Sequence, residues 1–295
     1  MSPFMAHLLF AVGAEPDTAV RPEGLGDHRM RMGTRLAGNL HETPDHGEHA
    51  METNPPANPG RRAFLLVPAA ALLLSGLPGH GGERKPLKIG IIGAGRIGGT
   101  LGELWVKAGH EVLLSSRHPE RLEDLARRLG PRARAGTPRE AAVFGDVILM
   151  SVPYGALPQV GRDLAAELAG KIVLDTGNPY PSRDGDMAVA ARAKGTGVAS
   201  AGFLPGVRLV RAFNSLPHTA LRSEAHRSGE RAAVPLAADD EEALRVAARL
   251  VEDAGFEPVA VGPLARAKEF DVGTAVYGKA LTARELRRGL GLARP

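Results

Sequence analysis

The chain has 295 residues, 43% of them hydrophobic, with no cysteine and a formal net charge of +4. The absence of cysteine excludes disulfides, thiolate catalysis and cysteine-based metal sites. The small positive charge is not gathered into a basic stripe with interleaved aromatic residues, so we expect no nucleic-acid partner. His41, His46 and His49 lie in a polar stretch and are interpreted as solvated side chains, so we expect no bound metal.

Residues 1–60 do not have the pattern of a folded domain. They are rich in Pro, Gly, His and charged residues, and they lack sustained hydrophobic periodicity. We interpret them as a disordered segment, or as an upstream segment that is absent from the natural product.

Residues 61–86 have the pattern of an export signal and a linker. Two arginines, Arg61 and Arg62, precede an apolar run of about 15 residues that ends at Leu77. This pattern is typical of a twin-arginine signal and predicts an exported, periplasmic protein. A transmembrane helix needs about 20 apolar residues, so we expect no stable membrane anchor beyond this segment. The alternatives are an apolar helix packed on the domain or lying in a membrane interface, and a cytoplasmic location.

The next segment predicts a dinucleotide site. An apolar run over 89–92 reads as a buried strand, and a glycine-rich loop and a helical stretch follow it. Gly93 permits a tight turn, Gly95 lets the backbone approach a pyrophosphate, and Gly98 lets the helix pack closely on the sheet. The N-terminus of the helix supplies N–H groups and a partial positive charge to the anion.

The end of the second strand, over 111–114, indicates which dinucleotide binds. An Asp or Glu at this point would bind the ribose hydroxyls of NAD and repel a 2′-phosphate. The chain instead has Ser116 and Arg117, with Arg121 one turn into the next helix. Because arginine holds a phosphate through paired, charge-assisted bonds, these residues favour NADP over NAD.

Strand and helix patterns alternate through the rest of the chain. Further strands are expected near 133–135 and over 146–152, 171–174, 207–212, 232–236 and 257–261. Helices are expected over 119–129, from Thr137, and over 186–201 and 240–254, with a loop and helix over 154–169 and a helical, basic tail over 265–292. This alternation predicts an α/β fold, a Rossmann-type doubly wound and mostly parallel sheet, in a single globular domain over 87–295.

In such a sheet the site lies outside the carboxyl ends of the strands. The segments that follow three of the strands, 151–154, 175–179 and 213–218, should therefore converge beside the dinucleotide. Three of their side chains titrate, and each has a structural explanation beside a catalytic one. Asp175 suits backbone N–H groups at a strand end, Tyr154 suits a pocket wall, and His218 suits a helix start.

Several of these segments together resemble the coenzyme F420-dependent NADP oxidoreductase family, in which NADPH-dependent F420 reductases and the reductase domain of the STEAP metalloreductases are found. The resemblance rests on Gly-Ala-Gly-Arg-Ile-Gly from Gly93, Ser-Ser-Arg from Ser115, Ser-Val-Pro-Tyr from Ser151, Asp-Thr-Gly-Asn-Pro from Asp175, Arg-Ala-Phe-Asn-Ser-Leu-Pro from Arg211 and Val-Gly-Pro-Leu from Val261. It covers nearly the whole of the predicted globular part.

The resemblance implies NADP(H) binding and hydride exchange with F420 or a flavin. It implies pyrophosphate contacts from Gly93, Gly95, Arg96, Ile97 and Gly98, 2′-phosphate contacts from Ser116, Arg117 and Arg121, and ribose and nicotinamide contacts from Ser151, Val152, Pro153 and Tyr154. Asn178 and Asn214 would lie near the nicotinamide and the acceptor ring, and with His218 they are the candidate catalytic residues. Hydride transfer between rings needs alignment and exclusion of water more than acid–base groups.

The sequence therefore favours an NADP(H)-dependent oxidoreductase acting on F420, a flavin or a related small-molecule acceptor. One alternative is a non-catalytic NADP(H)-binding redox sensor or scaffold, since catalytic side chains are sparse. Another is an enzyme like pyrroline-5-carboxylate reductase or β-hydroxyacid dehydrogenase. Those enzymes need a long helical C-terminal domain, whereas only a short tail follows Leu264. A homodimer is one assembly consistent with the sequence.

Overall fold

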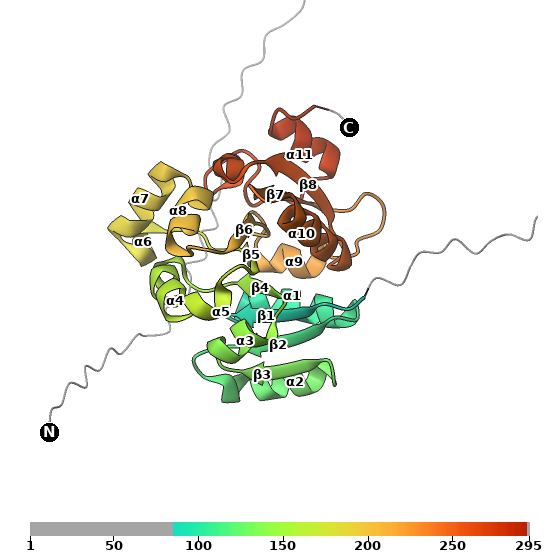
Figure 1. Ribbon diagram of the computed structural model, residues 1–295. Helices are drawn as coiled ribbons and strands as arrows, with labels where there is room; N and C mark the ends of the chain where they lie inside the picture. The colour runs from blue at the N-terminus through green and yellow to red at the C-terminus, as the bar shows by residue number, and fades with distance from the viewer. Residues whose placement is uncertain (1–84, 294–295) are drawn as a thin grey trace, which may run out of the picture. The chain divides into compact units, whose positions relative to one another are not determined.

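Eight strands form one sheet in the order β3-β2-β1-β4-β5-β6-β7-β8 in the computed structural model, which describes residues 85–293 (Figure 1). The strands are β1 (Lys88–Ile92), β2 (Glu111–Ser115), β3 (Ala133–Gly136), β4 (Val147–Met150), β5 (Ile172–Asp175), β6 (Arg208–Arg211), β7 (Ala233–Ala238) and β8 (Glu257–Gly262). All are rich in apolar residues, and β4, β5 and β7 are buried along their whole length, as strands covered on both faces should be.

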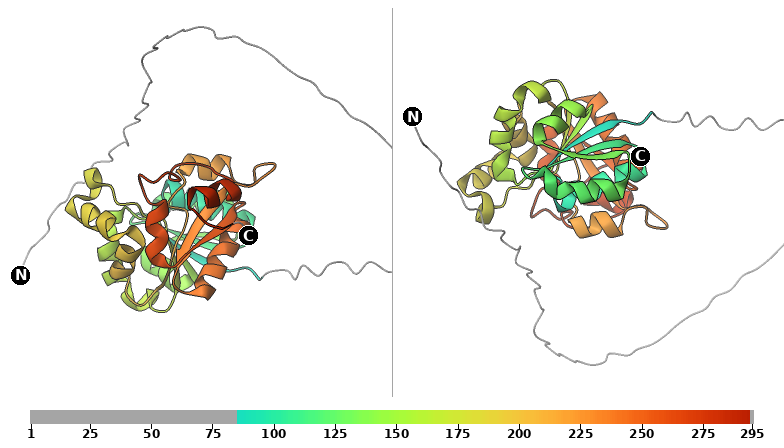
Figure 2. Two further views of the ribbon diagram at one scale, coloured as in Figure 1. Left: turned by 90° about the horizontal axis from the view of Figure 1, so that it is seen from above. Right: turned by 90° about the horizontal axis from the view of Figure 1, so that it is seen from below.

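Helices cover both faces of this sheet (Figure 2). The α-helices are α1 (Arg96–Lys107), α2 (Glu123–Leu129), α3 (Pro138–Phe144), α4 (Leu157–Asp163), α5 (Ala165–Leu168), α6 (Pro181–Asp184), α7 (Asp186–Lys194), α8 (Thr196–Phe203), α9 (His218–Ser223), α10 (Glu241–Asp253) and α11 (Ala283–Gly289). Three short 3-10 helices are η1 (Pro119–Leu122), η2 (Tyr154–Ala156) and η3 (Leu264–Phe270).

Strands β1 to β6 are parallel and follow the order of a doubly wound dinucleotide-binding sheet. Strand β7 pairs antiparallel with β6, and β8 lies parallel to β7. The predicted α/β, Rossmann-type, mostly parallel architecture is confirmed. The reversal at β7 was not predicted, because strand direction depends on where the intervening chain crosses the sheet and not on the composition of the strand.

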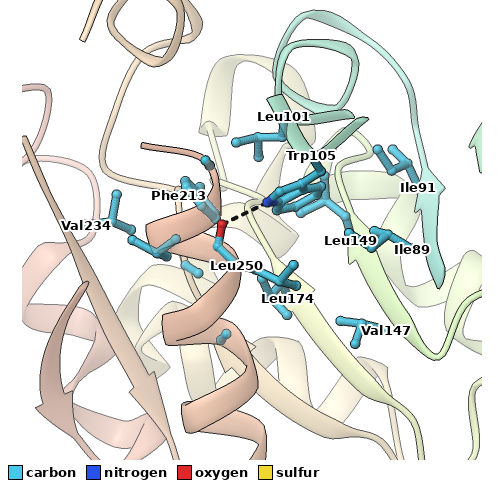
Figure 3. Packing of buried hydrophobic residues seen from close by; sticks show 14 of the residues in the cluster. Ile89, Ile91, Leu101, Trp105, Val147, Leu149, Leu174, Phe213, Val234 and Leu250 are labelled. Atoms are coloured by element: carbon cyan, nitrogen blue, oxygen red, sulfur yellow. Dashed lines mark hydrogen bonds between the residues drawn. The ribbon is translucent and has the colours of Figure 1, made fainter. Parts of the chain in front are cut away.

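The core is divided by the sheet. One cluster packs α1, α2, α9 and α10 against one face, and a second packs α3, α4, α5 and α8 against the opposite face. A third, smaller cluster packs η3 and α11 against β7 and β8. Trp105, the single tryptophan, lies in the first cluster, and its indole Nε1 donates to the carbonyl oxygen of Leu250 at 2.8 Å (Figure 3). Its ring meets Phe213 edge to face at 6.1 Å. This pair joins α1, α10 and the segment after β6.

Capping side chains fix the first residues of two helices. The helix predicted from Thr137 begins there as α3, with Thr137 as its cap and Pro138 in its first turn, and Glu140 completes a capping box that was not predicted. Asp240 caps α10 by accepting from the backbone N–H of Ala243 at 2.8 Å.

Two helix predictions are wrong. The helix expected over 186–201 is broken at Gly195, which has a φ of 90° that ends α7. The carboxylate of Asp271 then accepts from the backbone N–H of Thr196 at 3.0 Å and stabilises the start of α8. The tail expected over 265–292 is helical only in η3 and α11. Gly273 and Gly278, both at positive φ, keep the chain between them irregular.

The predicted disordered segment and the paired arginines of the export signal lie outside the described residues, so both stay predictions. Within 85–293, helices fall short of the length and apolar character that crossing a membrane requires. The same part of the chain has no group of three or more His, Asp or Glu side chains arranged for a metal ion.

Candidate functional site

The glycine loop after β1 is shaped for close approach. Gly93 has a φ of 98°, and a Cβ added to it would lie 2.4 Å from the backbone oxygen of Ser151. A Cβ at Gly98 would lie 2.3 Å from the carbonyl oxygen of Gly93. At Gly95, in contrast, an added Cβ would have no atom within 4 Å. Two glycines are therefore required by packing, and the third faces open space.

Gly95 is also the N-cap of α1. It accepts no side-chain cap, and the first turn of α1 has no acidic residue. The N-terminus of this 12-residue helix thus opens to space at Gly95, and no acidic residue of its own first turn compensates its partial positive charge. This arrangement suits an anion, as the sequence predicted for the pyrophosphate. Arg96, with an exposed side chain, and the half-buried Ile97 follow Gly95 in the same turn.

The end of β2 lies directly beside the loop. The carbonyl oxygen of Ser115 accepts from the backbone N–H groups of Gly93 and Ala94 at 3.2 and 2.8 Å. The next residue, Ser116, is half-buried, and its hydroxyl oxygen accepts from the backbone N–H of His118 at 3.0 Å. This turn places the predicted 2′-phosphate residues at the correct end of the strand.

Arg117 and Arg121 are both exposed. No ion pair joins either guanidinium to a carboxylate among the described residues, so both are available to a ligand. Between them lies an exposed pair, His118 with Glu120, at 3.4 Å.

The segments after β4, β5 and β6 converge as predicted. Ser151 packs against Gly93, and the backbone N–H of Thr176 donates to the carbonyl oxygen of Met150 at 3.1 Å. The side-chain amide of Asn178 donates to the backbone oxygen of Asn214 at 2.8 Å. A continuous row therefore runs along the carboxyl edge of the sheet from the glycine loop to the end of β6. We call the glycine loop and the segments that follow β4, β5 and β6 the carboxyl-edge row.

Tyr154 does not present its ring to this edge. The side chain is 1% exposed, and its hydroxyl bonds with the hydroxyl of Ser200 at 3.1 Å. Burial raises the pKa of Tyr154 to about 12, so the phenol stays neutral. Ser151 and Val152 are half-buried and Pro153 is exposed, which leaves these three in front of the tyrosine. Tyr154 is therefore buried beneath the carboxyl-edge row and does not line its exposed side.

A buried ion cluster holds the row together. Arg211, fully buried at the end of β6, donates from Nη1 to Oδ2 of Asp175 at 2.7 Å and to the backbone oxygen of Gly177 at 2.8 Å. Its Nη2 lies 3.3 Å from Oδ1 of Asp271. Burial alone would lower the pKa of the guanidinium, but the two carboxylates raise it, so Arg211 stays charged.

Asp175 therefore has the structural role that the sequence allowed. Its Oδ1 accepts from the backbone N–H of Gly177 at 2.8 Å, and its Oδ2 accepts from Arg211. Both oxygens are occupied by partners within the fold, and the carboxylate has 1% exposure. Asp175 is thus a poor candidate for a catalytic base.

The two predicted asparagines have buried oxygens without partners. Oδ1 of Asn178 and Oδ1 of Asn214 have no hydrogen-bond partner in the described part of the chain. Before Asn214, Phe213 has a φ of 59°, which is rare for an aromatic residue. This turn sends the Phe213 ring into the core, where it is fully buried. His218 begins α9 and is half-buried.

Two residues of this region were missed by the sequence reasoning. Asp271 joins the ion cluster, and Tyr277 places its hydroxyl 3.2 Å from the amide nitrogen of Asn178 and 2.7 Å from the hydroxyl of Tyr180. Both missed residues lie in the segment predicted as helix. The signal that could have identified them is the pair of glycines, Gly273 and Gly278, which interrupts any helix there.

A separate cavity of about 840 Å³ lies between the start of β8 and α11. Glu257, Arg284, Arg287 and Arg288 line it, and it shares no residue with the carboxyl-edge row. Its mixed charges do not select a ligand class.

Comparison with known proteins agrees with this geometry. Residues 88–179 match the family described as NADP oxidoreductase, coenzyme F420-dependent. Metalloreductase STEAP3 of Rattus norvegicus is 30% identical over 187 residues, which cover 62% of this chain and 36% of the relative. The chain thus spans about a third of the length of this curated relative.

Solved structures share the fold. A hypothetical protein from Sinorhizobium meliloti is 26% identical with a TM-score of 0.58, covering 67% of this chain and 96% of its own. A putative F420-dependent NADP-reductase from an Arthrobacter species is 18% identical with a TM-score of 0.50, covering 66% and 99%. Taken together, the matches support a relationship to NADP-dependent oxidoreductases.

Proposed function

We propose that this protein is an NADP(H)-dependent oxidoreductase that transfers hydride between NADP(H) and F420, a flavin or a related acceptor. The observation that carries the proposal is the open, uncapped helix terminus at Gly95 at one end of a carboxyl-edge row that ends in two unpartnered amide oxygens. The family match over 88–179 supports it.

The residues present fit an NADP molecule. The N-terminus of α1 suits the pyrophosphate, and the exposed Arg117 and Arg121 suit the 2′-phosphate. Oδ1 of Asn178 and Oδ1 of Asn214 are buried acceptors that suit the N–H donors of a carboxamide. When bound, NADPH supplies a hydride, and the protein aligns the two rings and excludes water.

A single-methyl substitution tests the pyrophosphate assignment. Gly95→Ala should fold normally, because the new methyl meets no atom, but it should weaken NADPH binding at least tenfold by occupying the approach path. Gly99→Ala, one turn further along α1, is the matched control, since its Cβ makes only ordinary contacts at 3.6 and 3.7 Å. NADPH fluorescence titration measures both. Equal affinities for the two variants would remove the pyrophosphate from this loop.

The nucleotide preference has its own test. Arg117→Ala should weaken NADPH binding far more than NADH binding, since only NADPH has the 2′-phosphate. Arg288→Ala, an exposed arginine on α11, should change neither. If Arg117→Ala lowers both affinities equally, the 2′-phosphate lies elsewhere.

The acceptor is found by mixing the full-length protein and NADPH with F420, FMN and ferric chelates in separate reactions. Oxidation of NADPH with any of them identifies the acceptor class. A second candidate function, a non-catalytic NADP(H)-binding sensor, is favoured by the way the fold occupies Asp175, Arg211 and Tyr154 with internal partners. Tight NADPH binding without oxidation by any acceptor would select the sensor.

We also propose that the protein is exported by the twin-arginine route, on the pattern of Arg61 and Arg62 before an apolar run. A reporter fused after Gly82 should be exported, and the same fusion with Lys in place of both arginines should stay in the cytoplasm. Unchanged localisation of the Lys variant would contradict the signal.

A further inference from the structure

A chain of three polar side chains lies beyond β5 in the carboxyl-edge row. Nδ2 of Asn178 donates to the hydroxyl oxygen of Tyr277 at 3.2 Å, and the hydroxyls of Tyr277 and Tyr180 are 2.7 Å apart. The orientation of the Asn178 amide is fixed, because its nitrogen also faces the backbone oxygen of Asn214 at 2.8 Å, which can only accept. The chain therefore starts from a donor.

The direction of the remaining bond follows from counting donors and acceptors. Tyr277 accepts from Asn178 and keeps its own hydroxyl hydrogen, since burial raises its pKa and the bond with Tyr180 raises it further. Tyr277 satisfies that hydrogen by donating to the oxygen of Tyr180. In the opposite direction the half-buried oxygen of Tyr277 would accept from both neighbours, whereas donation to Tyr180 gives a cooperative chain in which the hydroxyl that accepts from Asn178 also donates onward.

Tyr180 is consequently the end of the chain. Its oxygen accepts from Tyr277, and its own hydroxyl hydrogen has no acceptor among the described residues. The side chain is half-buried, and the guanidinium of Arg183 lies 5.2 Å from its ring centroid. The fold thus presents one aromatic O–H donor, supported from behind, five residues after the end of β5.

A conjugated ring that takes up a hydride also needs a proton. The hydride brings two electrons, so negative charge develops on a ring nitrogen or oxygen of the acceptor unless a donor neutralises it. Because Asn178 links this hydroxyl chain to the segment after β6, Tyr180 lies beside the region where we place the nicotinamide and the acceptor.

We propose that Tyr180 is the proton donor to the acceptor of the hydride, and that Tyr277 and Asn178 are positioning residues for it. The inference rests on the proposed oxidoreductase function. As the C–H bond of the reduced nicotinamide breaks, its hydride forms a C–H bond on a deazaflavin or an N–H bond on a flavin; the O–H bond of Tyr180 breaks, and its proton forms an N–H or O–H bond at a second ring atom of the acceptor. The O–H of Tyr277 stabilises the phenolate, and water returns the proton to the half-exposed Tyr180.

The test compares Tyr180→Phe with Tyr277→Phe in the full-length protein, using NADPH with FMN and with F420 as probes. Tyr180→Phe should slow single-turnover hydride transfer about 100-fold and abolish its solvent deuterium isotope effect. Tyr277→Phe should slow transfer less, about tenfold, and keep the isotope effect, because the donor itself remains. NADPH affinity should stay unchanged in Tyr180→Phe, and fluorescence of Trp105 reports whether each variant is folded.

A second readout does not depend on turnover. Without NADPH, Tyr180→Phe should bind oxidised FMN or F420 about fivefold to tenfold more weakly than the unaltered protein, since a hydrogen bond to the ring is lost. If Tyr180→Phe equals the unaltered protein in transfer rate and in acceptor affinity, the inference is overturned while the oxidoreductase function stands. If the unaltered protein reduces neither probe, the proposed function fails first, and the inference fails with it.

Discussion

Replacing Arg211 by Met should destabilise the protein more than the same substitution at Arg208, the other arginine of β6. The substitution removes the partner of Asp175, which is 1% exposed and cannot regain water without unfolding. It also removes the donor to the backbone oxygen of Gly177 and the contact with Asp271 at 3.3 Å. An uncompensated carboxylate is left in the interior, and that desolvated charge is the main cost.

Removing one partner of a buried ion pair costs about 3–5 kcal/mol. With a urea dependence of about 2 kcal/mol per molar, the unfolding midpoint should fall by about 1.5–2.5 M. Trp105 is the single tryptophan and lies fully buried against Phe213, so its fluorescence follows global unfolding without an added label.

Arg208→Met is the matched control, because Arg208 begins the same strand and pairs with Asp240 at 2.7 Å in a solvated setting. Arg208→Met should lower the free energy of unfolding much less, since exposed ion pairs are screened by solvent and contribute little. Adding Asp175→Asn to Arg211→Met should recover part of the lost stability by removing the unpaired charge. If the Arg211 and Arg208 variants unfold at the same urea concentration, the buried cluster does not hold the row together as argued.

Three further predictions concern the scaffold. Burial lowers the pKa of His110 below its ordinary value of about 6.5, although the neighbouring Asp253 acts in the opposite direction. The unfolded chain therefore binds a proton that the folded chain does not, so the free energy of unfolding should fall as the pH drops from 7 through 6.5 towards 5. Urea titrations at several pH values should show a flatter pH dependence for His110→Gln. Lys171→Met should lower the free energy of unfolding by about 1–2 kcal/mol, because the Lys171 ammonium donates to three carbonyl oxygens at the end of α3. Lys107→Met, at an exposed lysine, is the control, and an equal fall in melting temperature for both variants would contradict the prediction. Gly90→Ala should cost about 1–3 kcal/mol or prevent folding, because its Cβ would lie 2.1 Å from a carbonyl oxygen of α3; an unfolding midpoint equal to that of the unaltered protein would show that α3 can move away.

The local patterns of the sequence were sufficient for the Rossmann-type fold. Short apolar runs marked the central strands most clearly, because a strand covered on both faces is mainly apolar, as β4 and β7 are. The helix start at Thr137 and the glycine loop at Gly93 were also predicted from the sequence, since each depends on neighbours within a few residues. The tail beyond Phe270 was wrongly predicted as helix, and the contacts of Asp271 and Tyr277 with the segments after β5 and β6 were missed because they join residues far apart in the chain.

By itself, the sequence determined that a glycine loop precedes a helix and that Ser116 and Arg117, with no acid, occupy the end of the second strand, and these local facts are enough to favour NADP. Only the tertiary structure decided which polar residues are spent on the scaffold and which remain for a ligand. Arg211 and Asp175 neutralise each other inside the fold, whereas in the described residues the oxygen of the Asn178 amide has no partner and the hydroxyl of Tyr180 bonds only with Tyr277. The physical reason is that burial and hydrogen-bond pairing arise between segments far apart in the chain, so no local pattern records them.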